Sequence, residues 1–256
     1  MTRKHTSLLT AMAFVVLLGL QAGVITALGQ APSQAPGQGQ RPALLPIPIH
    51  SDTTRTLSSH FSPATSVKKA PNDKGFIQRW LVLEPIKKNI SRNNIFTDNY
   101  LRTTFSTDNF SNNFTVIPKN GDTIKVGDQE LKWYALDSKL FNFKLYRFAY
   151  AISKPQNGVL FWVVTVINCS EEIKNVRLSA GCNSAGMFWL NGKEALMLSG
   201  DRDMIVDNCT STRLTLNKGK NIIRGAIING PGIIDFCARF LDEKGEPIKD
   251  ITITCE

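Results

Sequence analysis

Short runs of apolar and β-branched residues, separated by turn residues, recur along the chain from Phe76 onward. The longest run, residues 158–167, is continuously apolar and predicts a central strand buried on both faces. The remaining runs are shorter, and they predict strands over 76–86, 130–134, 174–180, 204–207, 212–216, 222–228, 233–241 and 248–254. Turn signals at 119–122 and 126–128 bracket one more short strand. No segment has the period of a convincing amphipathic helix.

The strongest local signal is Asn191-Gly192, which stands between the apolar runs 187–190 and 193–198. Both central residues of a type I′ turn take positive φ, and Asn-Gly tolerates this conformation well. We therefore expect a tight antiparallel hairpin here. Together with the many short strands, spaced by roughly 8 to 12 residues, the hairpin predicts an all-β fold, an antiparallel β-sandwich or jelly roll.

The first part of the chain has a different composition. Residues 1–29 combine a basic start, an apolar run over 8–20 and small residues at 27–29, which is the pattern of a secretion signal peptide. Residues 30–75 are rich in Pro, Gln, Gly and Ser and predict a disordered tether. We expect a folded domain over 76–256 in a secreted or periplasmic protein without a stable membrane span. An uncleaved N-terminal anchor is the alternative.

Basic residues outnumber acidic ones, 30 to 21, which gives a formal net charge of +9. Lys and Arg are scattered among Asp and Glu, so we expect a mixed, solvated surface and no nucleic-acid partner. Anionic glycans or envelope polymers are alternative partners for a basic exported protein.

Catalytic chemistry is limited by the three histidines, His5, His50 and His60, because none lies in 76–256. The sequence also lacks a Gly-x-Ser-x-Gly elbow, so we expect neither a serine hydrolase nor a His-ligated metal in this domain. The five cysteines contain no Cys-x-x-Cys pair, and their odd number leaves at least one thiol unpaired. We interpret Cys237, inside the strand 233–241, as a packed thiol. The domain is therefore predicted to have no catalytic residue, metal or cofactor.

Catalysis by a pair of carboxylates remains a less favoured alternative, because a glycosidase needs two such groups beside a sugar bond. The candidates lie in surface segments and no spacing selects a pair: they are Asp98, Asp108, Asp137, Glu194, Asp201, Asp203 and Asp235.

Five stretches carry a family resemblance through their order and spacing. They are Trp80-Leu-Val-Leu-Glu-Pro85, Tyr150-Ala-Ile-Ser153, Gly186-Met-Phe-Trp-Leu-Asn-Gly-Lys193, Leu216-Asn-Lys-Gly-Lys-Asn221 and Phe236-Cys-Ala-Arg-Phe-Leu-Asp242. The region resembles the galactose-binding-like jelly rolls that occur as carbohydrate-binding-module-like accessory domains of exported bacterial glycan-processing proteins. Many relatives place two acidic residues where this chain has Gly-Cys-Asn-Ser-Ala-Gly at 181–186. A ligand or cation contact that needs that pair is therefore not expected.

A ligand site is predicted in the irregular, Asn-rich segment 87–113, whose pieces are expected to lie over the sandwich. Aromatic rings stack on sugars while polar side chains bond sugar hydroxyls, so the candidates are Asp98, Asn99, Tyr100, Trp133, Tyr134 and Arg239. Alternation places Trp133 and Tyr134 on opposite faces of their strand. Core packing of Tyr100 and Trp133, and a structural ion pair of Arg239, are the alternatives.

The function predicted from these observations is that of an exported, non-catalytic glycan-binding or accessory module. A structural or protein-interaction domain of a cell-envelope or surface assembly is the alternative.

Overall fold

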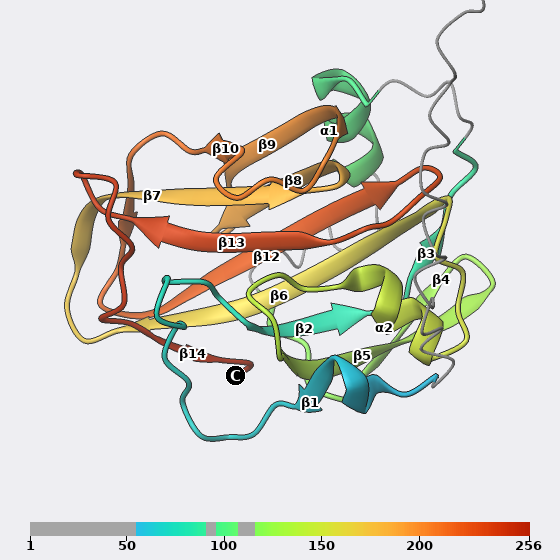
Figure 1. Cartoon of the computed structure of the whole chain (residues 1–256), viewed down its shortest axis with the longest axis horizontal. Coiled ribbons are helices and arrows are strands. Elements are labelled where there is room, and N and C mark those ends of the chain that lie inside the picture. The colour runs from blue at the N-terminus through green and yellow to red at the C-terminus, as the bar shows by residue number, and fades with distance from the viewer. Residues whose placement is uncertain (1–54, 91–95, 107–115) are drawn as a thin grey trace, which may run out of the picture. The chain divides into compact units, whose positions relative to one another are not determined.

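The computed structural model describes residues 55–90, 96–106 and 116–256, and these residues form an antiparallel β-sandwich with short helices (Figure 1). The larger sheet has the order β1 (Phe61–Pro63), β5 (Gln129–Ser138), β2 (Arg79–Leu83), β6 (Val159–Cys169), β12 (Gly219–Asn229), β8 (Ser184–Leu190) and β9 (Lys193–Arg202). Three short strands extend it: β3 (Ile86–Lys87) and β14 (Thr252–Thr254) pair with β6, and β4 (Thr123–Val126) pairs with β5.

The smaller sheet is built on β7 (Ile173–Cys182). Strand β13 (Phe236–Leu241) pairs with one edge of β7, while β10 (Cys209–Thr210) and β11 (Leu214–Leu216) pair with the other. The helices are η1 (Leu57–Ser59), α1 (Asp98–Ser106) and α2 (Leu145–Ala151). No helix among the described residues is long and apolar enough to cross a membrane.

The larger sheet is buried on both faces, and β6 shows why its sequence is continuously apolar. Phe161 and Val163 point into the core between the two sheets, whereas Trp162 and Val164 point to a second core on the outer face. The predicted central strand is therefore confirmed, as is the all-β sandwich. The finer assignment to a galactose-binding-like jelly roll stays a prediction.

The hairpin at Asn191-Gly192 is also confirmed. These residues have φ of +51° and +79°, and Leu190 pairs with Lys193 across the turn. Asn191 adds a contact that its turn propensity does not imply: its Oδ1 accepts a hydrogen bond from the Ile222 amide at 2.8 Å. The turn is thereby tied to β12.

Three expectations about elements are wrong. Helix α1 lies inside the segment 87–113, which was expected to be irregular, and it does cover the outer face of the larger sheet through Leu101 and Phe105. Helix α2 was not predicted. Residues 204–207 form a loop rather than a strand, and the Ile205 carbonyl oxygen lies only 1.8 Å from where a Cβ on Gly181 would stand. This loop lies on β7 because residue 181 has no side chain.

The predicted tether overlaps the folded part. Phe61 is 2% exposed in the core between the sheets, β1 pairs with β5, and Lys69 exchanges backbone hydrogen bonds with Ile253. The fold thus includes residues 55–75, because one buried ring and a few backbone pairs anchor an otherwise polar segment. The predicted signal peptide and the tether residues 30–54 lie outside the described residues.

Candidate functional site

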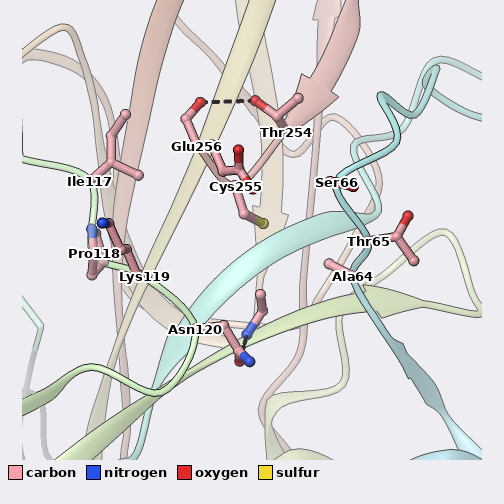
Figure 2. A pocket seen from close by; sticks show the side chains of 11 residues that line it. Ala64, Thr65, Ser66, Ile117, Pro118, Lys119, Asn120, Thr254, Cys255 and Glu256 are labelled. Carbon is pink, nitrogen blue, oxygen red and sulfur yellow. Dashed lines mark hydrogen bonds between the residues drawn. The ribbon is translucent and has the colours of Figure 1, made fainter.

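A cavity of about 540 Å³ opens on the outer face of the larger sheet, beside β5. It is lined by Ala64, Thr65, Ser66, Ile117, Pro118, Lys119, Asn120, Ala135, Thr254, Cys255 and Glu256. Figure 2 shows three walls around one space: residues 64–66 on one side, residues 117–119 opposite, and residues 254–256 between them. We call it the larger cavity.

The larger cavity exists because two partners of β5 diverge. Strand β1 pairs with the end of β5 and β4 pairs with its start, so the middle of that edge lacks a neighbouring strand. Asn120 fills the gap, and its Oδ1 accepts a hydrogen bond from the Ala135 amide at 2.9 Å. The opening therefore forms without an unsatisfied backbone donor at Ala135.

The wall at 64–66 belongs to an extended segment, residues 64–69, which we call the strap. Arg79, 3% exposed on β2, donates to the Val67 carbonyl through Nη1 at 2.5 Å and to both carboxylate oxygens of Asp137 at 2.8 and 2.9 Å. Lys69 adds an ion pair to the same carboxylate at 3.6 Å. The strap is thus held to the sheet by charged groups near the cavity.

A smaller cavity of about 190 Å³ adjoins the first. It is lined by Val116, Ile117, Pro118, Asp122, Thr123, Ile124, Trp133 and Arg224. Ile117 and Pro118 line both cavities, so the segment 116–120, which we call the arm, separates them.

The arm is fixed at both ends. Arg224, 1% exposed on β12, donates from Nη2 to the Val116 carbonyl at 2.6 Å. At the other end the Lys119 amide donates to Asp122 Oδ2 at 2.7 Å, and the Asp122 amide donates back to the Lys119 carbonyl at 3.1 Å. The partition between the cavities is therefore part of the folded framework.

Cys255 contributes a thiol to the larger cavity, and its sulfur points into the space in Figure 2. Burial raises the pKa of Cys255 to about 12, which the nearby Arg79 only partly opposes. A thiol with this pKa is protonated at neutral pH, and the thiolate is the form that acts as a nucleophile. The Cys255 side chain therefore contributes a weakly polar, unreactive surface to the wall of the larger cavity. All five cysteines are free thiols, and Cys237 is packed at 2% exposure as predicted.

The six predicted ligand residues do not meet in one site. Trp133 lines the smaller cavity but is 2% exposed, whereas Tyr134 lies on the opposite face of β5, as alternation predicted, and donates to Glu84 Oε1 at 3.3 Å. Asp98, Asn99 and Tyr100 form the first turn of α1, and the Tyr100 ring packs 5.8 Å from Phe96. Arg239 lies on the smaller sheet in an ion pair with Asp207.

Most of the cavity residues were missed by sequence reasoning. Thr65 and Ser66 fall in the predicted tether, while Thr254 ends the last strand and Cys255 and Glu256 follow it, so no local pattern joins them. Asn120 lies in the predicted turn 119–122, so the sequence did single out this segment. A turn motif does not predict that the Asn120 side chain accepts a hydrogen bond from the Ala135 amide on β5.

The chemistry available in the two cavities is hydrogen bonding and apolar contact. Among the described residues no group of three or more His, Cys, Asp or Glu side chains is placed to hold a metal ion. Hydroxyl, amide, ammonium and carboxylate groups surround an apolar floor, an arrangement that can bind a small polar molecule.

No protein-family model matches the chain. No curated protein matches it either. Among solved structures, a PA14 sugar-binding domain from an RTX adhesin has a TM-score of 0.39 at 9% identity, over 68% of this chain and 93% of that one. A PA14 domain of the MpAFP antifreeze protein has a TM-score of 0.39 at 10% sequence identity, and the match covers 75% of this chain and 96% of that one. A β-glucuronidase of an uncultured Clostridium sp. has a TM-score of 0.29 at 9% sequence identity, and the match covers 75% of this chain and 40% of that one. None of these likenesses assigns the chain to a family.

Proposed function

We propose that the protein is a non-catalytic glycan-binding module and that the larger cavity holds a short segment of the sugar chain. The observation that carries this proposal is the cavity itself, at about 540 Å³. Small-molecule sites typically measure roughly 300 to 1,000 Å³. Packed at the density of a protein interior, about two to three sugar residues would fill this space.

The lining suits a sugar because a pyranose ring has an apolar face and a rim of hydroxyls. Ala64, Ile117, Pro118 and Ala135 supply apolar surface. Thr65, Ser66, Lys119, Asn120 and Thr254 bring hydroxyl, ammonium and amide groups to the rim of the same space. Such a mixed lining binds through contact area and fixes orientation through hydrogen bonds.

A binding role is favoured over a catalytic one by the acidic groups present. Glu256 is the one Asp or Glu side chain among the described residues that line the larger cavity, whereas glycosidases use two carboxyl groups. The Cys255 thiol is protonated at neutral pH, and histidine does not line the cavity. The signal-like residues 1–29 support export, so we place the module in a secreted or periplasmic protein.

A bulky side chain at Thr65 tests this function. Thr65 is exposed and lines the larger cavity, so Thr65→Trp should fill the space without disturbing the core. Val67 lies two residues along the same strap, is 71% exposed and is outside the lining, which makes Val67→Trp the matched control.

The full-length protein is first screened on a glycan array, and the best oligosaccharide is then titrated by calorimetry. We expect Thr65→Trp to weaken binding by about tenfold or more, which corresponds to at least about 1.4 kcal/mol. Val67→Trp should bind as wild type does. Absence of any glycan ligand, or equal binding by both variants, would contradict the proposal.

A further inference from the structure

The two cavities lie side by side on one face of the larger sheet. Ala135 lines the larger cavity and Trp133 lines the smaller one, and both belong to the same outer core. Residues two apart along a strand are separated by about 7 Å. A disaccharide is longer than this distance, so two linked sugars of one ligand can reach from one cavity to the other.

The partition between the cavities is narrow. Ile117 and Pro118 contact both spaces and are only half-buried, so they form a shared apolar ridge rather than a closed wall. Because Arg224 and Asp122 hold the two ends of the arm, this ridge is already placed before a ligand arrives. Because the ridge is preformed, binding does not have to order the arm, and the entropic cost of binding is smaller.

The charges lining the cavities are balanced. Lys119 and Glu256 line the larger cavity, and Arg224 and Asp122 line the smaller one. An ionic ligand would meet a like charge in each space, despite the net charge of +9 on the whole chain. A neutral, hydroxyl-rich ligand meets no such repulsion and can hydrogen-bond to groups of both signs.

We propose that the smaller cavity is a second subsite of the same ligand site, so that one neutral oligosaccharide crosses Ile117 and Pro118 and occupies both cavities. This inference rests on the proposed glycan-binding function. At about 190 Å³ the smaller cavity takes a single sugar ring or its substituent. Trp133 forms part of its wall and, at 2% exposure, is no open stacking platform.

The test uses a variant that blocks the smaller cavity alone. Thr123 is exposed on β4 and lines this cavity, whereas Lys125 projects from the same face of β4 and does not line it. Thr123→Trp and Lys125→Trp are therefore a matched pair. The probes are neutral cello-, xylo-, manno- and laminari-oligosaccharides, from disaccharide to hexasaccharide, titrated by calorimetry against the full-length protein.

With the series that binds, wild-type affinity should rise with chain length until both cavities are filled. Thr123→Trp should remove this rise, so that long oligosaccharides bind about tenfold more weakly than to Lys125→Trp, while the shortest binding oligosaccharide is unaffected. Raising the salt concentration should leave these affinities unchanged, because the ligand is neutral. Thermal melts of both variants confirm that they are folded.

Three results would overturn the inference, and the first two leave the proposed glycan-binding function standing. If Thr65→Trp abolishes binding while Thr123→Trp behaves like Lys125→Trp at every length, the larger cavity binds alone. Preference for uronate-containing oligosaccharides, lost at high salt, would show that the ligand is anionic. Absence of binding by every oligosaccharide would overturn both proposals.

Discussion

The Asp207 carboxylate shows how one side chain joins a loop to the smaller sheet. It accepts hydrogen bonds from Nε and Nη2 of Arg239, the first at 3.0 Å, and from the Ser179 hydroxyl at 2.8 Å. The Arg239 hydrogen bonds lower the pKa of Asp207 below its ordinary value of 3.8, although burial opposes them. Arg239, one of the residues considered for ligand contact, thus has a defined structural role.

Asp207→Asn should lower the free energy of unfolding by about 1 to 3 kcal/mol at neutral pH, because charge-assisted hydrogen bonds are lost. A lowered native pKa stabilises the fold above pH 3.8, and that stabilisation is lost as the pH falls through the native value. The difference between wild type and variant should therefore shrink in acid. Urea denaturation at a series of pH values measures it.

Asp235→Asn serves as the contrasting variant. Burial raises the pKa of Asp235 above 3.8 despite the Lys144 ammonium 3.2 Å away, so ionisation destabilises the native state as the pH rises through the raised value. The introduced asparagine cannot ionise, so the variant avoids this destabilisation. Its free energy of unfolding relative to wild type should therefore increase as the pH rises from 3.8 through the raised pKa of Asp235. If the stability difference from wild type changed with pH in the same direction for both variants, the opposite pKa shifts given to Asp207 and Asp235 would be contradicted.

Among the predicted residues, alternation was the dependable guide. It placed Trp133 and Tyr134 on opposite faces of β5, and both faces proved to be packed. The sequence could not show that Trp133 is buried, because the outer core to which it belongs also takes residues from β2, α1, β6 and β8. A residue's face follows from local geometry, whereas its exposure depends on the whole fold.

At the scale of elements, β6 and the Asn191-Gly192 hairpin were predictable because their signals are local. Helix α1 carried a local signal too: Thr97 Oγ1 accepts a hydrogen bond from the Tyr100 amide at 3.2 Å, an N-cap interaction, and Asp98 occupies the first turn. Helix α2 buries Leu145, Phe148 and Ala149, a helical spacing. Both helices are shorter than three turns, so each pattern was too brief to stand out among the aromatics and asparagines.

Gly192→Val tests the hairpin. Gly192 has a φ of +79°, and a β-branched residue in this conformation is strained, so the free energy of unfolding should fall by about 1 to 3 kcal/mol. Neither turn residue lines a cavity, so binding at low temperature should be unchanged. An unaltered melting temperature would show that the turn tolerates a side chain there.

At the scale of the whole molecule, the start of the folded unit is open to test. A fragment of residues 76–256 lacks Phe61, β1 and the strap, whereas a fragment of residues 55–256 keeps them. Losing a buried Phe side chain alone costs about 3 to 5 kcal/mol, a large part of the roughly 5 to 15 kcal/mol that stabilises a typical domain. We expect the shorter fragment to melt at a much lower temperature or to be unfolded, as measured by circular dichroism. Equal melting temperatures would place the boundary at Phe76.

The fold class was predictable from the spacing of strands and turns, but the larger cavity was not. Its walls come from the strap, the arm and residues 254–256, and they meet because Lys69 pairs with Ile253 and Asn120 caps β5. Pairings between distant segments leave no periodic trace in the sequence. For that reason the predicted ligand residues and the cavity residues are almost entirely different sets.

The pairing of Lys69 with Ile253 also constrains when the protein can fold. The larger sheet joins β1, the first strand of the described chain, and β14, the last, to its interior strands β5 and β6. A growing chain cannot complete this sheet until residues 252–254 have left the ribosome. Sheets made of such non-local pairings close slowly, over about milliseconds to seconds. During that interval the stretch of β6 that β14 later covers, residues 166–168, is free to pair with other chains, which favours aggregation of the nascent protein.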